Sequence, residues 1–123
     1  MVMLDANMVL RYLLNDNEKM ADEAARIIEE GSVLVTIEII AEVVYVLKGV
    51  YSIDRDVIKT SLLNFLSEVH TDEPDVLKLG LETYSEQNLD FVDCILFAYN
   101  GVKGYEIKTF DKKLRNLLDN NKM

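Results

Sequence analysis

The sequence has 123 residues, half of them apolar, with 13 basic against 22 acidic side chains and a formal net charge of −9. It contains one proline and five glycines, which excludes a collagen-like or disordered chain and predicts a single domain over residues 1–123. The longest near-apolar run, residues 39–47, is nine residues long, whereas a membrane span needs about 20, so we expect no membrane segment. The lone Cys94 cannot form an internal disulfide, and no signal peptide is recognisable, so we expect a cytoplasmic protein.

The charge is unevenly distributed along the chain. Residues 1–100 hold 7 basic and 19 acidic side chains, whereas residues 101–123 hold 6 basic and 3 acidic ones. An acidic body argues against indiscriminate binding of nucleic acid. It permits a nucleic-acid enzyme whose carboxylates hold a cation and whose basic C-terminal end touches phosphate. The alternative is an acidic protein with a solvated basic helix.

Short apolar runs alternate along the chain with longer segments of helical periodicity. Strands are predicted at 2–4, 33–35, 68–71 and 106–109. Helices are predicted at 8–14, 19–30, 38–48, 54–67, 74–86, 90–102 and 111–118. Strands separated by helices require right-handed crossovers and a parallel sheet covered on both faces. The predicted fold class is therefore α/β, a three-layer α/β/α sandwich with a central parallel sheet of four to five strands.

Two acids directly follow predicted strands. Asp5 comes after the first strand and Asp111 after the last. Ligands gather at the carboxyl ends of strands in open α/β sheets, so both acids are expected to face a site. Each also stands where a helix begins, and the alternative is an N-cap.

Three further acids lie within helical segments. Glu42 stands among eight apolar residues in the run 39–47, so we predict that it is buried with a partner. That partner would be a cation, a basic residue in a structural ion pair, or its own proton. Asp90 and Asp93 are three residues apart and share one face of a helix start, either as capping acids or as part of a site.

Together these acids predict a site for a hard divalent cation. Strand-end acids converge at one edge of a sheet, and Mg²⁺ and Mn²⁺ prefer oxygen ligands. Because like charges that lie close together repel, at least one acid should have a raised pKa. Such a site suits the activation of water for attack on a phosphodiester.

In their order and spacing, these motifs resemble those of PIN domains. The likeness runs from residue 2 to about residue 115 and is carried by Asp5-Ala6-Asn7 with the segment Val9–Leu14, by Glu42, by Asp90-Phe91-Val92-Asp93 and by Thr109-Phe110-Asp111. Within PIN domains, the chain is most similar to the toxin nucleases of VapBC-type toxin–antitoxin systems. One departure is Ala6, where the family commonly has Ser or Thr.

The resemblance implies a Mg²⁺- or Mn²⁺-dependent endoribonuclease. Its catalytic acids and metal ligands would be Asp5, Glu42, Asp93 and Asp111. Supporting roles would fall to Asn7, Asp90 and Thr109. The implied partners are an RNA substrate and a small antitoxin whose C-terminal segment lies across the site.

A surplus of apolar residues near the first acids predicts an apolar groove or a homodimer surface. These residues are Met8, Leu10, Leu13, Leu14, Val43, Val46 and Val50. The alternative is that all seven belong to the core.

Other chemistries have weaker support in the sequence. A Cys94–His70 nucleophile lacks a third orienting group, and a single histidine excludes the usual zinc site. Residues 101–104 lack the spacing of a phosphate-binding loop, and a phosphoacceptor domain would need paired acids after the first strand. The alternatives kept are a non-catalytic PIN-fold interaction module and a free-standing RNA-processing nuclease.

Overall fold

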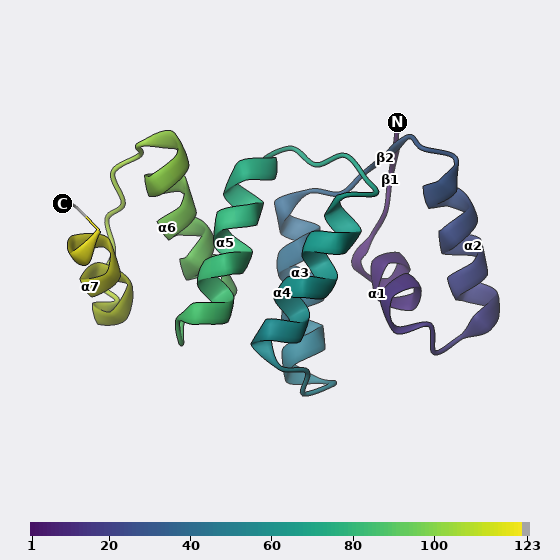
Figure 1. The fold of residues 1–123 in the computed structure, drawn as a ribbon, viewed down its shortest axis with the longest axis horizontal. Helices are drawn as coiled ribbons and strands as arrows, with labels where there is room; N and C mark the ends of the chain where they lie inside the picture. Colours follow the sequence, from purple (N-terminus) through teal and green to yellow (C-terminus); the bar gives the residue numbers. More distant parts are fainter. Residues whose placement is uncertain (122–123) are drawn as a thin grey trace. The chain divides into compact units, whose positions relative to one another are not determined.

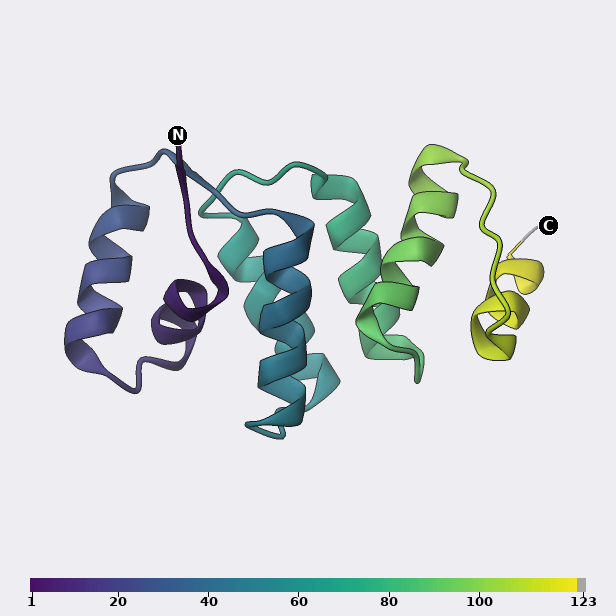
Figure 2. The same ribbon diagram turned by 180° about the vertical axis from the view of Figure 1, so that it is seen from behind.

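Seven helices make up most of residues 1–121, the part of the chain that the computed structural model describes (Figures 1 and 2). These residues group into an N-terminal unit, Met1–Glu73, and a C-terminal unit that begins at Pro74, and we describe each unit by itself. All seven predicted helices are confirmed, with ends within two residues of the predicted ones. None of the described helices has the length and apolar character needed to cross a membrane.

The N-terminal unit combines a small sheet with four helices. Its elements are β1 (Val2–Met3), α1 (Ala6–Leu14), α2 (Glu18–Glu29), β2 (Val33–Leu34), α3 (Ile37–Gly49) and α4 (Arg55–Leu66). β1 and β2 are parallel, with Val2 opposite Val33 and Met3 opposite Leu34. Helix α1 packs against both α2 and α3, and α3 packs against α4. The sheet therefore delivers the chain directly into α1, at whose start Asp5 stands.

The C-terminal unit is helical throughout its described part. Its elements are α5 (Pro74–Glu86), α6 (Phe91–Lys103) and α7 (Lys112–Asn120). Helices α5 and α6 pack closely at Gly80, where an added Cβ would lie 2.6 Å from Cδ1 of Ile95. The rings of Tyr84 and Phe91 meet edge to face, with centroids 5.8 Å apart. This packing fixes the start of α6, where Asp90 and Asp93 lie.

The sheet is smaller than the predicted four to five strands. Residues 68–71 contribute one parallel bridge, in which the His70 amide donates to Val33 (2.8 Å) and the Val35 amide donates to His70 (2.9 Å). Residues 106–109 form no strand. A strand needs a neighbour to receive its hydrogen bonds, and the described part of the C-terminal unit contains no other strand. The α/β pattern is thus present in the N-terminal unit, and the larger sheet is not confirmed.

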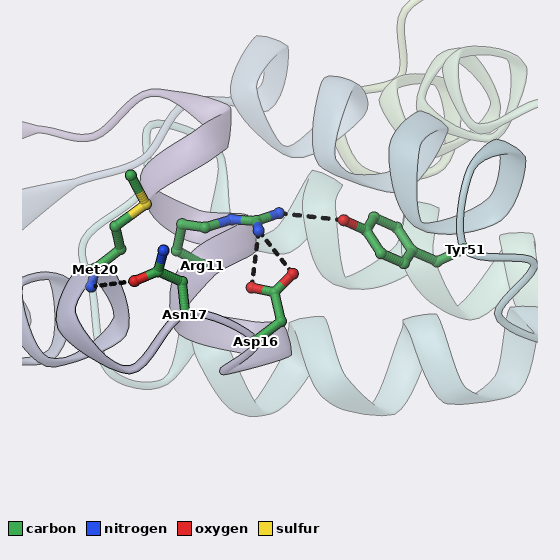
Figure 3. Close-up of polar contacts among 5 residues, drawn as sticks. All are labelled: Arg11, Asp16, Asn17, Met20 and Tyr51. Carbon is green, nitrogen blue, oxygen red and sulfur yellow. Dashed lines mark hydrogen bonds and ion pairs between the residues drawn. The ribbon is translucent and has the colours of Figure 1, made fainter.

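Polar contacts fasten α1 to the segments around it (Figure 3). Nη1 of Arg11 donates to both carboxylate oxygens of Asp16 at 2.7 Å, and Nη2 donates to the hydroxyl of Tyr51, just beyond α3, at 3.3 Å. Asn17 caps α2 by accepting from the Met20 amide at 3.0 Å. The guanidinium thus links the end of α1 to the loop before α2 and to the end of α3.

A second anchor of α1 is Tyr12. Its hydroxyl donates to Glu68 at 2.7 Å, and this hydrogen bond to a carboxylate raises the pKa of Tyr12 to about 12. The Tyr12 ring lies 5.9 Å, centroid to centroid, from the ring of Phe65 on α4. Helix α1 is therefore held through aromatic packing as well as through ion pairing.

Truncation of Phe65 should destabilise this unit strongly. Its side chain is only 2% exposed, so Phe65→Ala leaves a cavity and should lower the free energy of unfolding by about 3–5 kcal/mol. Chemical denaturation of purified protein measures the change. Val57→Ala on the same helix, where Val57 is 52% exposed, is the matched control and should stay within about 0.5 kcal/mol of wild type. An equal loss in the free energy of unfolding for Phe65→Ala and Val57→Ala would contradict the burial of Phe65 in the core.

Candidate functional site

Three carboxylates line one open cavity of about 280 Å³ in the C-terminal unit. They are Asp90 and Asp93, at the start of α6, and Asp111, at the start of α7. The rest of the lining is Asn88, Leu89, Lys112 and Lys113. The structure therefore brings three of the predicted site acids together, on two helix N-termini whose positive dipole ends favour negative charge.

The surroundings of Asp93 disfavour its charged form. Partial burial raises the pKa of Asp93 above its ordinary value, and the negative charges of Asp111 and Asp90 raise it further. This confirms the expectation that one acid of the cluster has a raised pKa. A cation beside Asp93 would relieve both the lost hydration and the repulsion.

Local hydrogen bonds fix the position of Asp111. Its Oδ1 accepts from the Leu114 amide at 2.8 Å, so it caps α7 as the alternative interpretation proposed. Its own amide donates to Oγ1 of Thr109 at 3.0 Å. Oδ2 of Asp111 accepts no hydrogen bond from the described residues, which leaves that oxygen available to a ligand. Capping and ligand binding are therefore compatible at Asp111.

Asp5 shows the same division of its two oxygens in the N-terminal unit. Oδ1 accepts from the Met8 amide at 2.9 Å and caps α1, while Oδ2 has no hydrogen-bond partner within residues 1–121. Asn7 is exposed in the first turn of the same helix. Glu42 lies in α3, which packs against α1. The N-terminal unit thus carries Asp5, Asn7 and Glu42 on neighbouring helices.

The prediction that Glu42 is buried is wrong. Its side chain is exposed, although Val43 and Val44 beside it are buried. A helix that is apolar over most of its surface still turns one face outward, and Glu42 lies on that face. Among the described residues it forms no ion pair, so the structural ion pair considered for it is not observed.

The donor set fits a hard divalent cation. All four predicted ligands are carboxylates, the ligand type that Mg²⁺ and Mn²⁺ prefer. Each unit supplies two of them, Asp5 and Glu42 in one and Asp93 and Asp111 in the other. Within either unit, the described residues contain no three His, Cys, Asp or Glu side chains arranged to hold a metal.

The sequence prediction did not include the other residues of the cavity wall. Lys112 and Lys113 directly follow Asp111, and this adjacency was the signal that could have identified them. Asn88 and Leu89 precede Asp90 in the same way. Cys94 and His70, by contrast, belong to different units, and Cys94 is buried with its Sγ 3.9 Å from the carbonyl oxygen of Leu89.

Comparison with protein-family models matches residues 2–118 to the PIN domain. The chain belongs to the PIN domain family. The match covers both units of this PIN domain, and members of the family are generally nucleases that typically use divalent metal ions. Comparison with curated proteins and with solved structures gave no match.

The predicted apolar surface of the PIN domain divides into three classes of exposure. Leu10 and Val43 are buried in the core, whereas Val50 is 68% exposed. The remaining four are half-buried: Met8, Leu13, Leu14 and Val46. The alternative that all seven belong to the core is therefore wrong, and apolar surface is exposed along α1 and α3.

Removing the charge of Asp93 should stabilise the metal-free protein. With its pKa raised in the folded state, ionised Asp93 lowers the stability at neutral pH, and this penalty fades as the pH falls through the raised pKa. Asp93→Asn should therefore melt at a higher temperature than wild type at pH 7 in EDTA. The difference should vanish near pH 3, below the ordinary pKa of Asp at about 3.9.

Asp75→Asn is the matched control, because Asp75 lies in the first turn of α5 outside the cavity. It loses the same charge at a helix N-terminus without relieving the repulsion, so it should not raise the melting temperature. Thermal unfolding followed by circular dichroism measures both variants. A lower melting temperature for Asp93→Asn at pH 7 would refute the electrostatic account of this cavity.

Proposed function

We propose that this PIN domain is a Mg²⁺- or Mn²⁺-dependent endoribonuclease that acts in the cytoplasm as the toxin of a toxin–antitoxin pair. The observation that carries the proposal is the cavity that Asp90, Asp93 and Asp111 share, where burial and the charges of Asp111 and Asp90 raise the pKa of Asp93. A structural cluster would pair such acids with basic groups, and these three have no ion pair among the described residues.

In this proposal the cation is held by Asp5, Glu42, Asp93 and Asp111. When bound, it supplies activation of water and stabilisation of the charge that develops on the leaving oxygen of a phosphodiester. Asp5 and Asp111 bind the cation through Oδ2, because Oδ1 of each residue accepts the capping hydrogen bond. Thr109 positions Asp111 through its hydroxyl, Asp90 adds negative charge beside Asp93, and Asn7 supports the site from α1.

We also propose that the functional protein has a three-layer sandwich with a parallel sheet of four to five strands. The parallel pairing of β1 with β2 and the parallel bridge at His70 support this arrangement. In the segment 106–109, Ile107 and Thr109 are β-branched, which favours extended backbone.

The proposed partners are RNA, a small antitoxin and a second copy of the chain. Support for the protein partners comes from the half-buried apolar residues of α1 and α3 and from Val50. Such a surface loses contact with water when an apolar segment or a second subunit covers it.

Purified protein should cleave RNA in the presence of Mg²⁺ or Mn²⁺ and stop when EDTA is added. Asp93→Asn and Asp111→Asn should each lower the rate by orders of magnitude, because each removes a ligand of the cation that stabilises charge. Asp75→Asn serves as the control and should cleave at the wild-type rate. Labelled RNA resolved on a denaturing gel measures all four proteins. Unchanged cleavage in EDTA would refute the metal mechanism, and no cleavage at all would favour the interaction module.

The chain should form a dimer through the surface that includes Val50. Val50→Lys places a charge on that surface and should shift the mass measured by light scattering from dimer to monomer. Val57→Lys, at the comparably exposed Val57 of α4, should leave the mass unchanged. A monomeric wild type at high micromolar concentration would contradict the dimer.

Inducing expression of this PIN domain should arrest growth. Co-expression of a small neighbouring gene that encodes the proposed antitoxin should relieve the arrest. Without relief by that gene, RNA cleavage would point to a free-standing processing nuclease.

A further inference from the structure

Phe110 is the most exposed large apolar side chain of the described residues. Its side chain is 98% exposed, and it stands in the chain between Thr109 and Asp111, the second of which lines the carboxylate cavity. Leaving an aromatic ring fully in water forgoes the free energy that its burial would supply. A flat ligand that covered the ring would recover that free energy.

The backbone on both sides of Phe110 is fixed. Thr109 accepts a hydrogen bond from the Asp111 amide through Oγ1 at 3.0 Å, and its carbonyl oxygen accepts from Nη2 of Arg115 at 2.6 Å. These two bonds close a turn from which Phe110 projects. An exposed ring on a braced turn costs little conformational entropy when a flat partner stacks on it.

Cationic side chains surround the turn. Lys112 and Lys113 line the carboxylate cavity, and Lys108 and Arg115 line a second cavity of about 300 Å³ that Thr109 also lines. The ammonium groups of Lys112 and Lys113 form no hydrogen bond or ion pair with any residue in 1–121, although three carboxylates share their cavity. Their charges are therefore available to an anionic ligand.

We infer that the turn of Phe110 with Lys112 and Lys113 is a binding site for single-stranded RNA, in which a base stacks on Phe110 and the two lysines contact the flanking phosphates. The inference deepens the proposed nuclease function and rests on it. An accessible base face is a property of single strands, because duplex bases are stacked on one another. Lysines are depleted in the centres of protein–protein interfaces, so this surface suits a phosphate-bearing ligand better than a second protein.

Binding of fluorescein-labelled single-stranded RNA, measured by anisotropy with Mg²⁺ present, tests the inference. Every protein in the assay carries Asp93→Asn, which slows hydrolysis and keeps the RNA intact. Adding Phe110→Ala should weaken binding about five-fold or more, the loss of one base stack, whereas Phe110→Tyr should restore it. Val57→Ala, which removes another exposed apolar side chain, should have no effect. The same RNA annealed into a duplex should bind weakly and should not respond to Phe110→Ala.

The contribution of Lys112 and Lys113 is measured separately, through the dependence of RNA affinity on salt concentration. Changing both Lys112 and Lys113 to Gln should reduce the slope of log affinity against log salt concentration by about 1.4, the value for two phosphate contacts on a single strand. Lys78→Gln, on exposed Lys78 of α5, should leave the slope unchanged. An unchanged affinity for Phe110→Ala, or an equal loss for single-stranded and duplex RNA, would overturn the inference.

The outcome is separable from that of the cleavage assay. Cleavage of RNA by the wild type without an effect of Phe110→Ala on binding would refute this site and leave the nuclease proposal intact. Binding that depends on Phe110, without any cleavage of RNA by the wild type, would support this site and refute the nuclease proposal.

Discussion

The proposed chemistry of this PIN domain depends on repulsion among its carboxylates. Asp90, Asp93 and Asp111 share one cavity, where burial raises the pKa of Asp93 and the charges of Asp111 and Asp90 raise it further. Two helix N-termini reduce the free-energy cost of holding these negative charges together, because α6 and α7 both begin at this cavity with their positive ends toward it. A protein that stores repulsion in this way gains stability when a cation binds, which couples its fold to its proposed chemistry.

Capping and the proposed binding of a cation would use different oxygens of the same side chains. Oδ1 of Asp5 and Oδ1 of Asp111 each accept a hydrogen bond from the amide three residues ahead, which restricts the orientation of the carboxylate and leaves Oδ2 without a partner among the described residues. A rigidly oriented ligand loses little entropy when it binds a cation. N-capping is therefore compatible with a functional role, because the capping bonds would position these acids for a cation.

Local features of the sequence predicted more of this structure than long-range ones. The helices followed from periodicity and from residues such as Pro74, which begins α5. The cavity followed in part from Asp111 and the Asp90–Asp93 pair, whose helix starts are local. The exposure of Glu42 did not follow, because an apolar run predicts burial on average and does not say which face of α3 turns outward. A strand at 106–109 would depend on pairing with distant residues, which composition alone does not determine.

Binding of Mn²⁺, followed by the electron paramagnetic resonance signal of the free ion, tests the central claim most directly. Wild type and the control Asp75→Asn should bind the ion with the same affinity. Asp93→Asn should bind at least about tenfold more weakly, because it removes one of the proposed carboxylate ligands of the cation. Equal affinity of Asp93→Asn and wild type would contradict the claim that Asp93 is a ligand of the cation.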